Sequence, residues 1–512
     1  MAEAKRFPCG GVATPHYLAS SAGLAVLADG GNAIDAAVAA NLTLGVVTPY
    51  FCGYGGDLFA VVWDGQLHGY LGSGRSAAAA SLDALQSEFD LMPIYGSHSV
   101  TVPGGPAGWF ALLERWGTRS FGDVAAAALR YARDGFEITR PAGEIFDGCR
   151  HLYAEFPDWL AAYGEATAGS VLRQPAMART IERLAADGPE AYYRGPIAEA
   201  IAVAVQAAGG VLTTADLAAY TDRFADPLRA PYRDVEIAEL PPQTQGVTAL
   251  EALRILDGQP LPAEGADRQH VLVEATTLAL ADREQYVSDP DAMPVPPADL
   301  IGDEWVKQRR EILDPRRAAA TARGAGRQGG TAYLCAADAD GLLVSLIQSN
   351  FLAFGSGVHV PEWGINLNNR GSSFSLDATS VNALAPSKLP MHTLIPAMAL
   401  RGGEPWLVFG SMGGDAQAQV HVQLMAHVID DGADPQVAID APRWRVEPAS
   451  GQLLAERRFP PEVLDDLRAR GHTVKAVRSF DSGMGHAHAI MRTPGGYAIA
   501  TDPRAEGAAL GV

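Results

Sequence analysis

The feature that most constrains the fold is a change of hydrophobic pattern near residue 330. From Pro103 to about Leu313 the apolar residues recur mainly at helical spacing. From Thr331 onward, "TAYLCAADADGLLVSLIQSN" alternates like two strands joined by an Asp-Gly turn. The segment between them, "DPRRAAATARGAGRQGG", is rich in chain breakers and typical of an exposed linker that is open to cleavage. Thr331 therefore heads a β-rich section, directly after two glycines.

Shorter patterns predict other elements. Two helices meet at Gly30, and Asn32 is expected to cap the second one. Asp64-Gly65 predicts a hairpin turn, and Thr214 is expected to cap a later helix. "EPWLVFGSMGG" predicts a strand that ends in a glycine turn before a helix, and "AHAIMRTPGGYAIATDPR" predicts a terminal hairpin.

Composition and charge exclude several classes of function. A formal net charge of −20 argues against a nucleic-acid partner, and any anion site must be built locally. The four cysteines form no CxxC pair, so neither a disulfide framework nor a zinc site is expected. The N-terminal residues lack the apolar core of a signal peptide, and no segment approaches the length of a membrane span. We expect a soluble, cytoplasmic protein without membrane contact.

Cleavage before Thr331 would create an unusual nucleophile. A threonine hydroxyl is weak without a base beside it, whereas a free α-amine has a pKa near 8 and can serve as that base. Gly329 and Gly330 are expected to adopt strained dihedral angles, which would let the Thr331 hydroxyl reach the Gly330 carbonyl. An acyl shift from nitrogen to oxygen, followed by hydrolysis, would free the amine. The alternative is an ordinary loop that enters a strand.

Other motifs favour simpler interpretations. Gly30-Gly31-Asn32 lacks the spacing of a nucleotide-binding loop, and a helix already precedes it. His486 and His488 have no third ligand at metal-site spacing, so they are interpreted as strand positions. Ser411 in "GSMGGD" is not flanked like the nucleophile of an α/β-hydrolase.

A series of motifs runs through nearly all 512 residues: "GGNAIDAAVAAN", "GYGGD", "TVPGGPAGW", "PPQTQG", "DREQYVSDPD", "LNNRGSSFS", "SMGGD", "DAPRW" and "DPRAEG". With this series the chain resembles the γ-glutamyltransferase family. The resemblance implies an N-terminal nucleophile hydrolase with a four-layer αββα sandwich. It implies self-cleavage into a large subunit, 1–330, and a small subunit, 331–512, which together form one composite domain. It also implies no metal or cofactor, and it leaves the assembly open, a dimer of heterodimers included.

The resemblance also implies roles for single residues. Thr331 matches the family nucleophile, with the cleavage site between Gly330 and Thr331, and Ser349 matches a hydroxyl residue that hydrogen-bonds it. Gly413 and Gly414 match the pair whose backbone N–H groups form the oxyanion hole, a role for which glycines are well suited. Arg75 matches the arginine that binds the substrate carboxylate.

The chain departs from the family pattern where γ-glutamyl enzymes hold the substrate α-amine. Arg370 and Ser373 replace acidic or amide side chains, and a guanidinium cannot accept a hydrogen bond from an ammonium group. The family asparagine falls at Phe351 beside Asn350, and a serine pair becomes His392 and Thr393. We therefore expect Arg75 and Arg370 to select an acidic acyl group rather than to hold a γ-glutamyl amine. The other expected substrate-binding residues are Asn350, Phe351, Ser373, His392 and Thr393.

The sequence thus predicts an autoprocessed amide hydrolase or acyltransferase for acidic acyl groups. The acyl group is expected to be γ-glutamyl or, in better agreement with Arg370, a dicarboxylate monoamide without the α-amine. Two alternatives remain open: hydrolysis of a C–C bond through the same acyl-enzyme, and a catalytically silent homologue that acts as a binding protein. The sequence also leaves open the acceptor and whether the loop 375–387 forms a lid.

Overall fold

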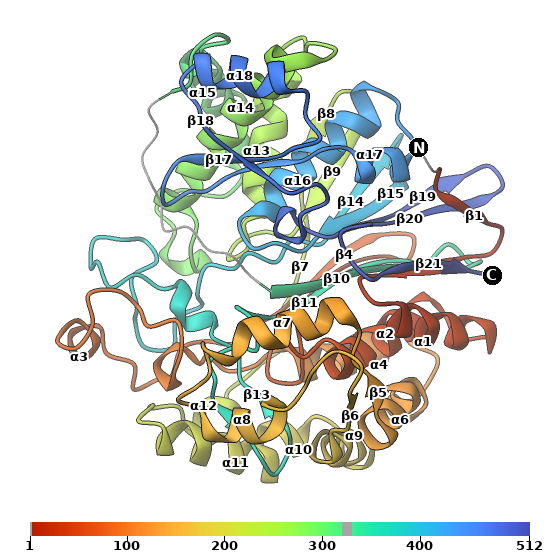
Figure 1. Ribbon diagram of the computed structural model, residues 1–512, viewed down its shortest axis with the longest axis vertical. Coiled ribbons are helices and arrows are strands. Elements are labelled where there is room, and N and C mark those ends of the chain that lie inside the picture. Colours follow the sequence, from red (N-terminus) through yellow and green to blue (C-terminus); the bar gives the residue numbers. More distant parts are fainter. Residues whose placement is uncertain (1–2, 320–329) are drawn as a thin grey trace.

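The computed structural model describes residues 3–319 and 330–512. Two seven-stranded antiparallel sheets lie face to face between two layers of helices, as Figure 1 shows. This arrangement confirms the predicted αββα sandwich. Within the described ranges, no helix is both long and apolar enough to cross a membrane.

The first sheet contains the C-terminal hairpin and the strand before the glycine turn. Its strands, in spatial order, are β1 (Lys5–Phe7), β20 (Gly496–Thr501), β19 (Ala487–Thr493), β15 (Glu404–Ser411), β14 (Ala397–Arg401), β9 (Val235–Glu239) and β8 (Leu228–Tyr232).

The second sheet contains the strand that begins at the expected cleavage site. Its strands, in spatial order, are β21 (Ala508–Gly511), β2 (Gly11–Thr14), β10 (Gly330–Ala337), β11 (Leu343–Phe351), β3 (Asp57–Trp63), β4 (Leu67–Gly72) and β7 (Phe224–Ala225).

Alternation along the central strands explains the layers. On β10, Tyr333 and Cys335 point into the apolar core between the sheets, whereas Ala332 and Leu334 pack with the helices that cover the second sheet. On β15, Val408 joins the core between the sheets, and the residues on either side of it pack against the helices that cover the first sheet. These strands are buried on both faces, which accounts for their nearly continuous apolar sequence.

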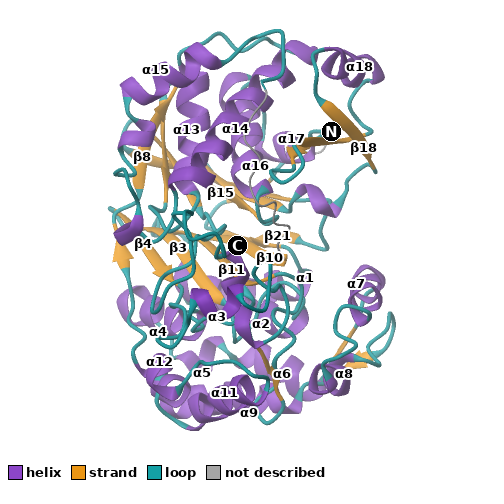
Figure 2. Cartoon of the chain, turned by 90° about the vertical axis from the view of Figure 1, so that its left-hand side faces the viewer, coloured by secondary structure: helices purple, strands orange, loops and turns teal. Residues whose placement is uncertain are grey.

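Two groups of helices cover the outer faces (Figures 1 and 2). The layer on the second sheet comprises α1 (Tyr17–Ala28), α2 (Ala33–Val47), α4 (Gly105–Trp116), α5 (Phe121–Val124), α6 (Ala126–Asp134), α7 (Arg140–Arg150), α8 (Pro157–Tyr163), α9 (Pro175–Asp187), α10 (Glu190–Tyr193), α11 (Pro196–Ala207) and α12 (Thr214–Ala218). The layer on the first sheet comprises α13 (Gly246–Asp257), α14 (Gly265–Tyr286), α15 (Asp303–Ile312), α16 (Ala416–Met425), α17 (Pro435–Asp440) and α18 (Pro461–Ala469).

Smaller elements complete the described chain. They are α3 (Leu82–Gln86), the pair β5 (Phe136–Glu137) and β6 (Val171–Leu172), the pair β12 (His359–Val360) and β13 (Ile365–Asn366), and a three-stranded sheet of β16 (Trp444–Val446), β17 (Gln452–Glu456) and β18 (Thr473–Val477).

Each large sheet takes strands from both sides of the Gly330–Thr331 bond. In the second sheet, β10 lies between β2 and β11, so residues near the N-terminus pair directly with the strand that Thr331 heads. In the first sheet, β14 pairs with β9. A break at this bond would therefore leave two segments that share both sheets and their core.

Most local predictions are confirmed, and two need correction. Asn32 caps α2 in a reciprocal capping box, and Asp64-Gly65 turns the β3–β4 hairpin. The cap of α12 is Thr213 and not Thr214, because the Thr213 hydroxyl accepts from the Asp216 N–H. The mainly helical section also contains β8 and β9, which complete the first sheet.

Candidate active site

A chain of hydroxyl groups surrounds the Gly330–Thr331 bond in the uncleaved chain. The Thr331 hydroxyl donates to Ser349 Oγ at 3.2 Å, and the Ser349 hydroxyl donates to the Gly330 carbonyl oxygen at 2.6 Å. Ser349 Oγ also accepts from the Phe351 N–H at 2.7 Å. Both hydroxyl residues are almost fully buried. The expected hydrogen bond between Thr331 and Ser349 is therefore present, and Ser349 in addition polarises the carbonyl carbon that Thr331 would attack.

A register irregularity places these groups together. β10 and β11 pair with Gly330 opposite Phe351 and Ala332 opposite Gln348, so the ladder shifts at Thr331. Phe351 has a positive φ of 80°, which is a strained conformation for a bulky residue. Such irregularities commonly re-aim a side chain next to a functional site.

Gly330 is required for a different reason from the one that the sequence suggested. It is an extended residue of β10 without a positive φ, so the expected strained dihedral angle is not found there. A Cβ at this position would instead lie 2.7 Å from the Tyr50 carbonyl oxygen. Glycine thus permits close backbone approach. Gly329 lies outside the described residues.

Gly413 and Gly414 form a tight turn between β15 and α16. Their φ angles are 131° and 60°, conformations that favour glycine at both positions. Neither backbone N–H donates a hydrogen bond within the described ranges. Two unused adjacent donors are what an oxyanion hole requires.

A buried polar network holds this turn. Gln245 Nε2 donates to the Gly414 carbonyl at 3.0 Å, and Arg283 donates to both Gln245 and Asp415 at 2.6 Å. Burial lowers the pKa of Arg283, but the ion pairs with Asp415 and Glu284 outweigh burial and raise it. These residues belong to "PPQTQG", "DREQY" and "SMGGD", three of the motifs that carry the family resemblance.

One cavity brings the two glycine sites together. It has a volume of about 260 Å³, and Gly330 and Gly413 line it with apolar side chains such as Tyr50 and Phe51. Arg445, on β16, also lines it and is only 8% exposed. The Arg445 guanidinium pairs with Glu447 at 2.6 Å, whereas its Nε has no partner in the described chain. The cavity therefore offers a cation beside the expected cleavage site.

Arg370 contacts Phe351, the last residue of β11, beside the register shift. Its guanidinium carbon is 3.9 Å from the centre of the Phe351 ring, and its Nη1 donates to Thr393 Oγ1 at 3.3 Å. Arg370 is fully buried. The ring contact joins Arg370 to Phe351, and the hydrogen bond joins Arg370 to Thr393. Three positions at which the chain departs from the family pattern are therefore in contact.

Asp57 is the acidic partner that sequence reasoning missed. Its Oδ2 lies 4.0 Å from Arg370 Nε and accepts from His392 Nε2 at 3.0 Å. Burial raises the pKa of Asp57 to about 7, although Arg370 and the Gly104 N–H act in the opposite direction. Burial, followed by the charge of Arg370, places the pKa of His392 well below its usual range, so His392 is a neutral donor.

The structure gives Arg75 a separate environment. Arg75 donates to Asp289 at 3.2 Å and to the Ser387 carbonyl at 2.9 Å, and its side chain is 44% exposed. It lines another cavity, with Arg223. Arg75 and Arg370 therefore have different carboxylate partners. Asp415 accepts from Arg283 Nη1 at 2.6 Å.

Asn350 and Ser373, two further residues predicted for the site, are also buried. Asn350 donates weakly to the Pro49 carbonyl at 3.4 Å. Ser373 ends the short 3₁₀ turn that Arg370 begins, and its carbonyl accepts from Asn382. Asn382 thus connects the loop 375–387 to the Arg370 turn. Around Thr331, the described residues contain no set of metal ligands.

The sandwich and the buried hydroxyl at the head of β10 define the class of protein. This is the architecture of the N-terminal nucleophile hydrolases, in which the catalytic residue heads a strand of the central sheets.

Comparisons with known proteins narrow the class to a family. The model of the γ-glutamyltranspeptidase family matches residues 19–512, and this chain belongs to that family. It is 38% identical to the oxamate amidohydrolase proenzyme of Klebsiella pneumoniae over 97% of both chains, and 36% identical to the glutathione hydrolase-like YwrD proenzyme of Bacillus subtilis over 98% of both. The crystal structure of cephalosporin acylase from Bacillus halodurans matches with a TM-score of 0.93 and 36% identity, over 100% of this chain and 96% of that one.

These relatives support an enzyme, an amidohydrolase or acyltransferase. Two of them are named as proenzymes, which implies that the family's chains are processed into a large and a small subunit.

Proposed function

We propose that this protein cleaves itself before Thr331 and then hydrolyses or transfers the acyl group of amides whose acyl part carries a carboxylate. The observation that carries the proposal is the hydrogen-bond chain from Thr331 through Ser349 to the Gly330 carbonyl. It connects a candidate nucleophile with the bond that must break to activate it.

This geometry supports self-cleavage by a shift of the acyl group from nitrogen to oxygen. Thr331 Oγ1 adds to the Gly330 carbonyl carbon while its proton passes toward Ser349, and the Ser349 hydroxyl stabilises the negative charge on the carbonyl oxygen. The C–N bond then breaks, its nitrogen takes up the proton, and an ester joins Gly330 to Thr331. Water hydrolyses this ester, which releases the Gly330 carboxylate and a Thr331 with a free amine.

Turnover repeats the same steps on an external amide. The Thr331 amine accepts the hydroxyl proton as Oγ1 attacks the substrate carbonyl, and passes it to the leaving amine. The N–H groups of Gly413 and Gly414 stabilise the oxyanion, because both are unused donors and Gly413 lines the same cavity as Gly330. Water or another amine then takes the acyl group from Thr331.

Two buried arginines support an acidic acyl group. By the family resemblance, Arg370 stands at the sequence position where a γ-glutamyl enzyme holds an ammonium group, and it is buried. Arg445 lines the cavity with Gly413. A guanidinium attracts a carboxylate and repels an ammonium group. Oxamate, named for the Klebsiella relative, is a dicarboxylate monoamide, so the proposed class includes it.

A matched substrate panel tests the class. Amides of oxalic, succinic and glutaric acid are compared with the γ-glutamyl amide of the same amine, so that only the acyl part changes. We expect the highest kcat/KM for a dicarboxylate monoamide. A preference for the γ-glutamyl compound would refute the acyl specificity and leave the nucleophile untouched, whereas no turnover by the processed protein would favour a silent homologue.

A further inference from the structure

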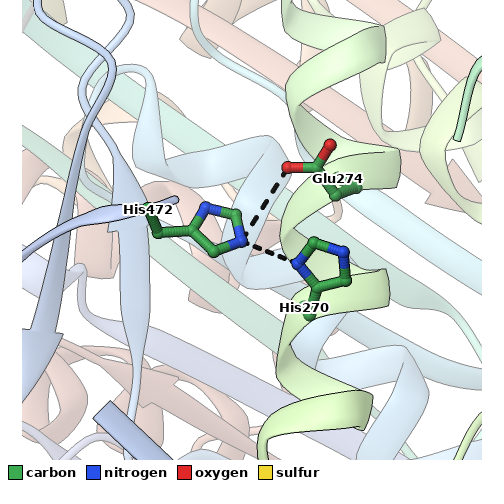
Figure 3. Close-up of side chains that lie close together, drawn as sticks. All are labelled: His270, Glu274 and His472. Carbon is green, nitrogen blue, oxygen red and sulfur yellow. Dashed lines mark hydrogen bonds and ion pairs between the residues drawn. The ribbon is translucent and has the colours of Figure 1, made fainter. Parts of the chain in front are cut away.

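Three potential metal ligands meet far from Thr331 in the sequence. His270 and Glu274 lie one turn apart on α14, and His472 lies between α18 and β18. Figure 3 shows the three side chains pointing toward one another, and their ligand atoms all lie within 4.8 Å. His270 Nδ1 is 2.8 Å from His472 Nε2, which lies 3.9 Å from Glu274 Oε1. Sequence spacing missed this group because nearly 200 residues separate its two parts.

We propose that His270, Glu274 and His472 bind a divalent first-row metal ion such as Zn²⁺, as a structural site outside the catalytic centre. Two imidazoles and one carboxylate are a ligand set that zinc uses, with a solvent molecule as the fourth ligand. The inference does not depend on the proposed catalytic function.

Hydrogen bonds to the backbone already orient two of the ligands, His270 and Glu274. His270 Nε2 lies 2.9 Å from the Asp314 carbonyl, to which it donates, so Nδ1 carries the lone pair that faces the cluster. Glu274 Oε2 accepts from the Ala319 N–H at 2.8 Å, which leaves Oε1 toward His472. Metal-binding histidines and carboxylates are typically held by such outer contacts.

The charge of the cluster favours a cation. The lone pair of His270 Nδ1 and the Glu274 Oε1 atom both face His472 Nε2. The nearby Arg470 is already bound to Asp267 and Asp466. Glu274 is buried, and its closest ion-pair partner is His472, at 3.9 Å. A divalent ion would compensate this buried carboxylate.

Only a small movement is needed for binding. Ligand nitrogens around tetrahedral zinc, at about 2.0–2.1 Å from the metal, lie roughly 3.3 Å apart. The two imidazoles must therefore separate by about half an ångström, and Glu274 Oε1, now 3.9 Å from His472 Nε2, must move closer by about as much. The His472 proton must also move from Nε2 to Nδ1. His472 follows Gly471, whose φ is 104°, on a turn that leads into the edge strand β18. This turn can supply the shift.

Such a site would join the two proposed subunits. His270 and Glu274 precede the Gly330–Thr331 bond and His472 follows it, so one ion would bridge both products of cleavage. His270 also contacts the Asp314 carbonyl, and Glu274 accepts from the Ala319 N–H. The site therefore also contacts residues near the end of the first described range.

Zinc titration of the purified protein tests the site. After removal of bound metal, Zn²⁺ is titrated in competition with a chromophoric chelator, and metal content is measured by mass spectrometry. We expect one Zn²⁺ per chain, and a loss of affinity of more than about 100-fold in His472→Gln and in Glu274→Gln, since even outer-contact changes cost 10- to 100-fold. His427→Gln is the matched control, because His427 forms an exposed pair with Asp431.

Two results would overturn the proposal. One is the absence of stoichiometric Zn²⁺ binding by the wild type, and the other is unchanged affinity in a folded His472→Gln protein. Thr331→Ala, which keeps all three ligands in one uncut chain, should bind Zn²⁺ like the wild type. The result of the titration is therefore independent of whether the catalytic proposal holds.

Discussion

The Ser349 hydroxyl lies 2.6 Å from the Gly330 carbonyl oxygen, on the strand next to the bond that is expected to break. Because Ser349 also accepts from Thr331, one side chain contacts both the nucleophile and its target. From this relationship we expect self-cleavage to depend on Ser349 more than on any residue other than Thr331.

Ser349→Ala should slow self-cleavage strongly, since both hydrogen bonds are lost in a buried site. Loss of one oxyanion donor typically costs about 10²–10³ in rate. The measurement is the time course of conversion from one band to two on a denaturing gel. Ser345→Ala is the matched control, because Ser345 lies on the same strand and its hydroxyl bonds with Tyr333. Equal rates in wild type and Ser349→Ala would remove Ser349 from the mechanism.

Gly413→Ala should lower kcat by about 10²–10³ with little change in KM. A side chain is strained at a φ of 131°, and its Cβ would meet the Ala416 Cβ at 3.1 Å, so the backbone donors must move. Gly432→Ala provides the control, since Gly432 also has a positive φ but open space around it. A folded Gly413→Ala enzyme with wild-type kcat would show that this turn does not stabilise the oxyanion.

Arg370→Gln should reduce kcat/KM for dicarboxylate monoamides by about ten- to a hundredfold, the value of a charge-assisted contact. The same change should partly relieve the penalty against a γ-glutamyl amide, because the repulsion of its ammonium group is removed. The matched control is Arg401→Gln, whose guanidinium lies 3.8 Å from the Trp406 ring centre on an exposed strand end. If both substrates respond equally to Arg370→Gln, the residue does not set acyl specificity.

The Asp57 carboxyl predicts a pH effect on binding. Its pKa is raised to about 7, so it becomes neutral as the pH falls through 7 and leaves the Arg370 charge less compensated. The affinity for a non-reactive dicarboxylate inhibitor should therefore increase from pH 8 to pH 6. Asp57→Asn should show no such change over this range. An inhibition constant with the same pH dependence in both proteins would rule out Asp57 as the titrating group.

Much of the fold could be predicted from local patterns. The alternation after Thr331 and the Asn32 cap are decided by neighbours in the sequence, and the structure confirms both. β8 and β9 were missed because they are short and lie in a mainly helical section, where pairing with β14 decides their conformation.

The candidate site was predictable only in part. The resemblance pointed to Thr331 and Ser349, which form a hydrogen bond at one strand end, and to the glycine pair, of which Gly413 lines a cavity with Gly330. Asp57 and Arg445 could not be found in this way, because a buried charge is recognised only by the partner that folding brings to it. Asp57 stands in the "GYGGD" motif, which was a signal of its importance but not of its contact with Arg370.

The mass of the purified protein, measured together with the N-terminal sequence of its smaller part, tests the central claim most directly. We predict two chains, residues 1–330 and 331–512, with the second beginning Thr-Ala-Tyr-Leu. Thr331→Ala should remain one inactive chain, because it lacks the hydroxyl that attacks Gly330. A wild-type protein that stays in one piece and hydrolyses amides at full rate would contradict the account, since the amine of Thr331 would still be locked in a peptide bond.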